Sequence, residues 1–189
     1  MKIYRHGTAA AKERQQRIVK RGQDYTKKTR QTVEAILAEV RKNGDKALET
    51  YSRRFDAPKI SARNFRVTPK EMDSAAKVVD KRFVRALNRA VRQVSAFHRA
   101  QMQASWLKSE RPGVLLGQQV RPVDSAGMYV PGAQGGETPL VSTVVMGAIP
   151  AKTAGVTKVV MVTPPQKNGR VDPHLLVAAN KVGVDEIYK

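Results

Sequence analysis

The segment from Pro122 to Pro165, PVDSAGMYVPGAQGGETPLVSTVVMGAIPAKTAGVTKVVMVTPP, constrains the fold of this chain more than any other. It begins with a short extended run, Ala126–Val130, and passes through a glycine-rich turn into an apolar stretch over 140–154 that has the length of a helix. The run Lys158–Thr163 follows, and its β-branched residues are typical of a strand buried in a parallel sheet. A strand, a helix and a second strand in this order predict a parallel α/β unit with a right-handed crossover.

Residue patterns outside this segment predict helices before it and a further helix and strand after it. Thr68 is expected to cap a helix that starts at Pro69, with Glu71 closing the capping box, and Trp106 is expected to anchor the end of a long helix. The last helix should begin after Asp172 and end at Gly183. The other expected elements are an exposed helix or arm over 10–24, helices around 29–43, 47–55 and 81–103, a strand over 64–68, extended runs over 114–123 and 126–130, and a strand over 185–189.

The order of elements predicts an α/β fold, in which an N-terminal helical segment precedes a parallel βαβαβ unit. Composition changes at Pro112–Gly113, so we place a boundary there. Residues 1–111 are expected to form a basic, mainly helical region with a short strand. Residues 112–189 are expected to form the α/β unit.

The charge of +19 is unevenly distributed along the chain. Residues 1–110 contain 27 Lys and Arg against 11 Asp and Glu, which leaves most of the net charge in that region. Such a region could bind nucleic acid through its phosphates, or it could simply form solvated helix faces. The second interpretation is favoured, because the few aromatic residues do not alternate with the basic ones as a stacking platform would require. We therefore expect only weak, non-specific binding of nucleic acid.

The absence of cysteine excludes disulfides, thiolate zinc sites and cysteine nucleophiles. No apolar run approaches the ~20 residues of a membrane-spanning helix. The N-terminal residues also lack the apolar core of a secretory signal. We accordingly expect a cytoplasmic protein without a membrane partner.

The glycine-rich turn is the one motif that points to a ligand. Gly132, Gly135 and Gly136 precede a helix, whose N-terminal N–H groups could bind a phosphate. The spacing is not GxGxxG, however, and no acidic residue follows on the next strand, so a simple tight loop explains the turn equally well. The three histidines, His6, His98 and His174, lie far apart and form no HxxxH or HExxH pair, so no metal-binding residue is assigned. No nucleophilic or other catalytic residue is assigned either.

A series of short motifs, in a fixed order, resembles the histidinol dehydrogenase family. Each motif alone is weak, but together they run from about residue 30 to the last residue and are highly specific. The matching segments are VRKNGDKALETY at 40–51 followed by RFD at 54–56, FHRAQ at 97–101, GMYVPG at 127–132, AIPAKTAG at 148–155, MVTPP at 161–165 and GVDEIY at 183–188.

This resemblance implies an oxidoreductase of histidine biosynthesis that uses NAD to oxidise L-histidinol through L-histidinal to L-histidine. It also implies one zinc ion per active site, a glutamate–histidine pair in acid/base roles, and an intertwined homodimer of incomplete Rossmann-like domains. The tyrosine of the GLYVPG motif belongs to the NAD site of the family, so the resemblance assigns Tyr129 to cofactor binding. The zinc ligands and the acid/base pair of the family have no counterpart in these 189 residues. We therefore expect the chain to be a fragment that is inactive alone.

Two departures from the family pattern keep other functions open. Ala133 stands where the family usually has a second glycine, and the loop Gly132–Thr138 is about three residues longer than usual. The segment Thr138–Thr143 stands where the family commonly has YPSS. The alternatives are a sister zinc- and NAD-dependent alcohol dehydrogenase of the same scaffold, for example one acting on sulfopropanediol, and a basic nucleic-acid-binding or interaction protein.

Overall fold

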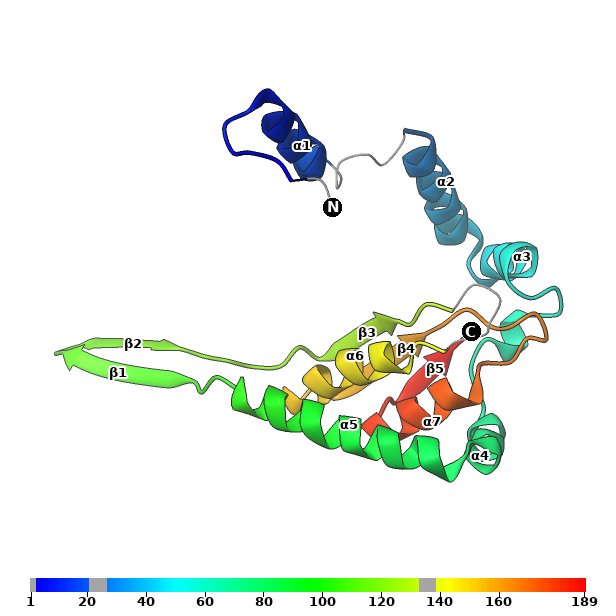
Figure 1. Ribbon diagram of the computed structural model, residues 1–189. Helices are drawn as coiled ribbons and strands as arrows, with labels where there is room; N and C mark the ends of the chain where they lie inside the picture. The colour runs from blue at the N-terminus through cyan, green and yellow to red at the C-terminus, as the bar shows by residue number, and fades with distance from the viewer. Residues whose placement is uncertain (1–2, 21–26, 133–138) are drawn as a thin grey trace. The chain divides into compact units, whose positions relative to one another are not determined.

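The computed structural model describes residues 3–20, 27–132 and 139–189, and it consists of two compact units that divide between Leu48 and Glu49. In the first unit, α1 (Ala9–Lys20) and α2 (Lys27–Asn43) are separate helices, and α3 (Asp45–Phe55) begins there (Figure 1). Gly44 adopts a positive φ of 54°, which lets the chain turn between α2 and α3. These helices confirm the predicted ones, and no residue of α1 or α2 is buried.

The second unit contains the predicted parallel sheet. Its strands β3 (Ser125–Tyr129), β4 (Lys158–Val162) and β5 (Glu186–Tyr188) lie side by side in chain order. They are connected by α6 (Val141–Thr153) and α7 (Pro173–Val182). Asp172 caps α7, and Gly183 ends it in the left-handed conformation with φ of 80°. The α/β class and the βαβαβ order are thus confirmed.

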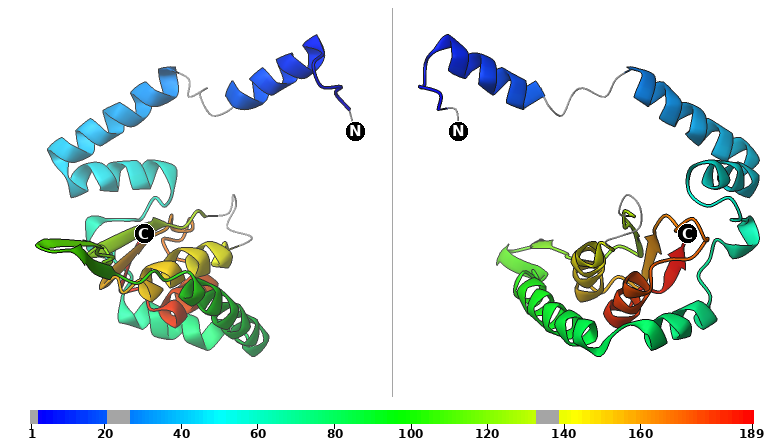
Figure 2. Two further views of the ribbon diagram at one scale, coloured as in Figure 1. Left: turned by 90° about the vertical axis from the view of Figure 1, so that its left-hand side faces the viewer. Right: turned by 45° about the vertical axis from the view of Figure 1, so that its right-hand side comes forward.

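Two further helices complete this unit as an outer layer. Helices α6 and α7 cover one face of the sheet, and α4 (Pro69–Val78) and α5 (Lys81–Ala100) pack against these two helices (Figure 2). The predicted capping box starts α4: the N–H of Glu71 donates to Thr68 Oγ1, and the N–H of Thr68 donates to Glu71 Oε2. None of the described helices is both long enough and apolar enough to cross a membrane.

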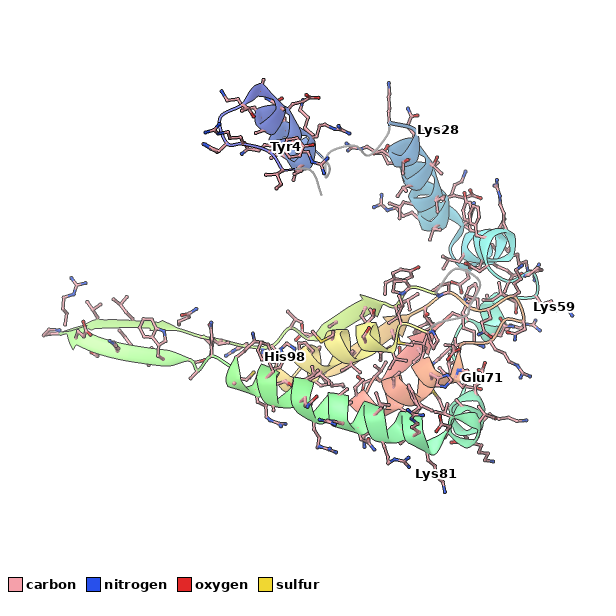
Figure 3. The ribbon with its side chains drawn as sticks, viewed as in Figure 1. Tyr4, Lys28, Lys59, Glu71, Lys81 and His98 are labelled. Carbon is pink, nitrogen blue, oxygen red and sulfur yellow. The ribbon has the colours of Figure 1, made fainter. Side chains whose placement is uncertain are left out.

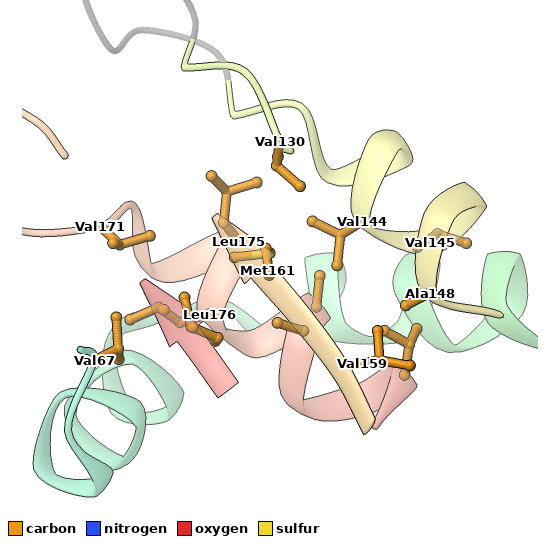
Figure 4. Packing of buried hydrophobic residues seen from close by; sticks show 14 of the residues in the cluster. Val67, Val130, Val144, Val145, Ala148, Val159, Met161, Val171, Leu175 and Leu176 are labelled. Atoms are coloured by element: carbon orange, nitrogen blue, oxygen red, sulfur yellow. The ribbon is translucent and has the colours of Figure 1, made fainter. Parts of the chain in front are cut away.

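The core of the second unit lies between the sheet and the helices on its covered face. Side chains of β4, α6 and α7, among them Met161, Val144 and Leu175, gather there (Figure 4). Leu87 of α5 and Ala75 of α4 belong to the same core. Residues on both sides of Pro112 therefore share one core, and the division into domains at 1–111 and 112–189 stays a prediction.

The expected strand over 64–68 is largely absent. A short 3-10 helix, η1 (Ala62–Asn64), precedes a single antiparallel bridge between Arg66 and Tyr188. The N–H of Val67 donates to Ile187 O at 2.9 Å, and the N–H of Lys189 donates to Phe65 O at 2.8 Å. Residues 65–67 thus cover the outer edge of β5. The pattern over 64–68 resembles a strand because this segment lies along a sheet edge. Its pairing with β5 is too short to form a strand.

The role expected for Trp106 is also wrong. The long helix α5 ends at Ala100, and Trp106 begins a strand, β1 (Trp106–Arg111), that pairs with β2 (Val114–Gln118) as an antiparallel hairpin. Gly113 makes the turn with φ of 73°. No clear pattern predicts β1, because its alternation places apolar and charged side chains on both faces, and all its residues are exposed.

Candidate functional site

The carboxyl ends of the three parallel strands form the candidate site. Tyr129, Val162 and Tyr188 are paired across the sheet in one row, as the last residue of each strand. Because side chains alternate along a strand, all three point to the face of the sheet opposite the helices. Tyr129 is 63% exposed and Val162 is 44% exposed, so this open face presents an aromatic ring beside an aliphatic surface. Tyr129, which the resemblance assigns to cofactor binding, is thus an exposed residue at the carboxyl end of a strand.

The next residue of each strand points to the covered face instead. Val130 and Thr163 are fully buried, and their N–H groups donate to Val162 O and Tyr188 O respectively. The side chain of Lys189 is only 5% exposed. Thr163 Oγ1 is buried without a hydrogen-bond partner among the described residues. A buried hydroxyl usually finds a partner, so this atom is an available donor and acceptor directly beneath the strand ends.

A partly buried ion pair fixes the end of β5 to helix α4. Lys189 Nζ donates to Glu71 Oε1 at 2.5 Å, while Glu71 Oε2 accepts from the N–H and the hydroxyl of Thr68. Burial alone raises the pKa of Glu71, but the hydrogen bond from Lys189, the two from Thr68 and the positive charge of Lys189 together lower that pKa below its ordinary value of 4.5. The capping box that the sequence predicted therefore does more than start a helix, because it also neutralises a lysine at the site.

The turn after β3 approaches β4 closely. A Cβ atom added at Gly132 would lie 2.9 Å from Cγ of Pro164, closer than two carbon atoms can approach without displacement. Gly132 thus has a packing role next to the strand ends. The rest of the loop predicted to bind the cofactor, Ala133–Thr138, lies outside the described residues. Beyond it, α6 begins after Leu140, and no side chain of the described residues caps it. The N–H groups of Val141 and Thr143 donate to Pro139 O and Leu140 O, so only part of the first turn is open to a ligand.

The opposite, amino end of the sheet is held together by ionic contacts. Lys152, at the end of α6, donates to Asp185 Oδ2 at 2.6 Å and to Thr157 O at 3.3 Å, and the N–H of Val159 donates to the same carboxylate oxygen. The hydrogen bond from Lys152, followed by that from Val159, lowers the pKa of Asp185 below 3.8. Lys152 and Asp185 both lie in the motif series. Here they have a structural role at the end of the sheet away from the candidate site.

The histidines do not form a metal centre. His98 Nδ1 lies 2.7 Å from Oε1 of Gln101, within the FHxxQ motif, and His174 Nδ1 lies 3.0 Å from Oδ1 of Asp172. Within residues 3–20, 27–132 and 139–189, no three His, Asp or Glu side chains converge as metal ligands would. The described residues therefore do not fit the zinc ion that the resemblance implies.

The arrangement at the strand ends suits a flat, partly apolar ligand with a phosphate. An exposed tyrosine ring can stack on or hydrogen-bond to a nucleotide, and an uncapped helix N-terminus favours an anion. Open α/β sheets bind ligands outside the carboxyl ends of their strands. Sequence reasoning identified Tyr129 but missed Tyr188 and Thr163, because their place beside Tyr129 depends on the order and register of the strands.

Comparisons with known proteins agree with the motif series. The family model described as histidinol dehydrogenase matches residues 19–189. A histidinol dehydrogenase of Desulfotalea psychrophila is 51% identical over 157 residues, and one of Symbiobacterium thermophilum is 48% identical over 157 residues. Each match covers 83% of this chain. The chain belongs to the histidinol dehydrogenase family.

A solved structure supports the same conclusion for the fold. The crystal structure of histidinol dehydrogenase from Elizabethkingia anophelis matches with a TM-score of 0.78 and 31% sequence identity, over 85% of this chain. The chain covers 36% of that structure, and 36% and 35% of the Desulfotalea and Symbiobacterium histidinol dehydrogenases. It thus spans about a third of the length of the relatives that it matches.

Proposed function

We propose that this chain forms the NAD side of a histidinol dehydrogenase, which oxidises L-histidinol through L-histidinal to L-histidine. The observation that supports this proposal is the exposed ring of Tyr129 at the carboxyl end of β3, in the motif that carries the NAD-site tyrosine of the family. When bound, NAD supplies the acceptor for hydride in each of the two oxidations. Histidinol, zinc and a homodimeric assembly belong to the same proposal for the whole enzyme.

In this proposal, the residues of this chain bind and orient the cofactor, and they carry no step of the oxidation. Tyr129 contacts the nucleotide on the open face of the sheet. Gly132 lets the turn after β3 pass close to Pro164, and α6 begins after Leu140. No group of the described residues is placed to transfer a proton from an alcohol, so we propose that the 189-residue chain is inactive alone.

Binding of NAD to the 189-residue chain tests the role of Tyr129. We expect weak binding, measured by saturation-transfer NMR and equilibrium dialysis, that Tyr129→Ala reduces by at least threefold. Tyr4→Ala is the matched control, because Tyr4 is also an exposed tyrosine, at 42%, but lies in the first unit. Equal binding by the wild-type chain and the Tyr129→Ala variant would refute the assignment of Tyr129.

An activity assay tests the proposed division of labour. The isolated chain, supplied with L-histidinol, NAD and zinc, should produce no NADH above the level without enzyme. Steady NADH production that disappears in a variant of the chain would show that residues of this chain suffice for the oxidation. That result would contradict the proposal of inactivity, whereas the NAD-binding test would be unaffected.

A sister alcohol dehydrogenase of the same scaffold is the second candidate. The segment Thr138–Thr143 in place of the usual YPSS, and the longer loop before it, support this alternative. Val141–Thr143 form the first residues of α6, at the edge of the sheet where this proposal places the cofactor. The whole enzyme, tested with histidinol and with a sulfonated diol in parallel assays, would distinguish the two by which alcohol reduces NAD.

A further inference from the structure

Helix α5 carries a row of arginines and no acidic residue. Its 20 residues, KRFVRALNRAVRQVSAFHRA, include six Lys or Arg and neither Asp nor Glu. Five of these cations are arginines, and all five are exposed: Arg82, Arg85, Arg89, Arg92 and Arg99. Figure 3 shows the extent of the helix, with Lys81 labelled at its start and His98 near its end.

The arginines occupy one side of α5. At 3.6 residues per turn, their positions fall within an arc of about 100° around the helix axis and extend along about 26 Å of it. The opposite side carries Leu87, which is buried, and the partly buried Phe83, Val91 and Val94, which pack against the core. The core therefore fixes the orientation of α5, and the arginine face points away from it.

None of the five guanidinium groups forms an ion pair with the described residues. Elsewhere in the chain, arginines on helices do find acidic partners: Arg30 pairs with Glu34, and Arg53 pairs with Glu49. On α5 no acidic residue stands three or four positions from any of these arginines, whereas Arg82, Arg85, Arg89 and Arg92 follow one another at those spacings. Like charges at such spacings destabilise a helix. A surface that only has to be soluble can mix positive and negative side chains. A face that carries positive charges alone attracts anions, and so suggests an anionic partner.

A recess at the end of this face has the same character. It has a volume of about 350 Å³ and lies between α5, α6 and α7. Its polar lining consists of Ser95, Arg99, Lys152, Thr153 and Lys181, and no carboxylate lines it. Lys152 is engaged by Asp185, whereas Arg99 and Lys181 have no ion-pair partner among the described residues. These two unpaired cations and the hydroxyls of Ser95 and Thr153 can surround one phosphate group.

We propose that the arginine face of α5, together with this recess, binds the phosphate backbone of nucleic acid. Arginine is suited to this role because its planar fork binds phosphate oxygens through two hydrogen bonds. An acidic protein partner is disfavoured, since a protein interface needs apolar or aromatic anchors at its centre. Within the arc of the arginines, the other side chains are only Lys81, Ala96 and Ala100. The proposal is independent of NAD binding at the strand ends.

Binding of a mixed-sequence DNA duplex of about 20 base pairs, followed by fluorescence anisotropy, tests the proposal. The test variant replaces Arg82, Arg85, Arg89 and Arg92 by Gln. The matched control replaces Lys12, Arg14, Arg17 and Lys20 of α1 by Gln, which removes the same charge from another exposed helix. Thermal unfolding of both variants checks that the second unit stays folded.

The α5 variant should lose at least tenfold in affinity at about 50 mM salt, and the slope of log K against log salt should decrease by roughly three to four, since each phosphate contact contributes about 0.9. The α1 control should lose less than about threefold. A paired change of Arg99 and Lys181 to Gln should reduce the slope by roughly two.

Equal losses in the α5 and α1 variants would show that only the total charge matters, and would overturn the proposal. Displacement of the duplex by polyglutamate of equal charge as effectively as by unlabelled duplex would also overturn it, in favour of an acidic protein.

Discussion

The two faces of the same three-stranded sheet differ sharply in their surroundings. On the covered face, Val159, Met161 and Ile187 are 5% exposed or less and contact the helices. On the open face, Tyr129 and Val162 are largely exposed, although they belong to the same strands and alternate with the buried residues. Parallel sheets usually have helices on both faces. The covered face therefore specifies the fold of this unit, while the open face is available for a ligand or for another part of the whole protein.

The largest expected difference between the faces lies within β4. Met161→Ala should lower the free energy of unfolding by about 2–5 kcal/mol, because it removes a fully buried side chain and leaves a cavity. Val162→Ala, one residue later on the open face, should lower it by less than about 1 kcal/mol. Urea denaturation of both variants measures the two values. Equal losses would mean that the open face is covered in solution, and would remove the distinction between the faces.

The covered face also contains a charged side chain, Lys189, and the loss of its partner should have the second-largest effect on stability. Lys189 points into the covered side and is stabilised by Glu71, whose folded-state pKa is lowered. A lowered pKa means that the stabilisation is present above the unfolded value near 4.5 and is lost as the pH falls through the folded value. Glu71→Gln should lower the free energy of unfolding by about 1–3 kcal/mol at neutral pH, because it leaves a buried lysine without its counter-ion.

The same variant should also lose less of its remaining stability on acidification than the wild-type chain. Urea denaturation at neutral pH and below pH 4.5 compares the two proteins. Asp73→Asn is a suitable control, because Asp73 lies two residues further along the same helix and forms no ion pair with the described residues. An Asp73 variant that behaves like the Glu71 variant would show that the effect is general to α4 and does not come from the contact with Lys189.

Sequence reasoning identified most of the covered face and little of what lies around it. The β-branched run Lys158–Thr163 and the caps at Thr68, Asp172 and Gly183 were predictable, because each depends on neighbouring residues only. The hairpin that begins at Trp106 was missed, since its exposed faces carry no clear alternation. The bridge between Arg66 and Tyr188 was also missed, because it joins residues far apart in the sequence.

At the candidate site, sequence reasoning was limited in the same way. Tyr129 was found through a motif, and its role in NAD binding stays a prediction. The contact between Glu71 and Lys189 was not found, because its partners come from α4 and from the end of β5, and no local pattern connects them. The row formed by Tyr129, Val162 and Tyr188 depends on the order and register of the three strands, which periodicity alone does not determine.

The smallest effect is expected from two glycines of one motif, GMYVPG, that lie in different surroundings. A Cβ atom at Gly127, on the open face, would meet no atom within 4 Å, and its φ is not positive. Gly127→Ala should therefore leave the free energy of unfolding unchanged or raise it by up to about 1 kcal/mol, because alanine restricts the unfolded chain.

At Gly132 the added atom would lie 2.9 Å from Pro164 Cγ, and the proline ring cannot turn aside. Gly132→Ala should lower the free energy of unfolding by about 1 kcal/mol through this overlap. Urea denaturation of the two variants decides between a motif glycine required by packing and one required only by the ligand. If Gly132→Ala unfolds like the wild-type chain but binds NAD more weakly, the glycine serves the cofactor loop and not the contact with Pro164.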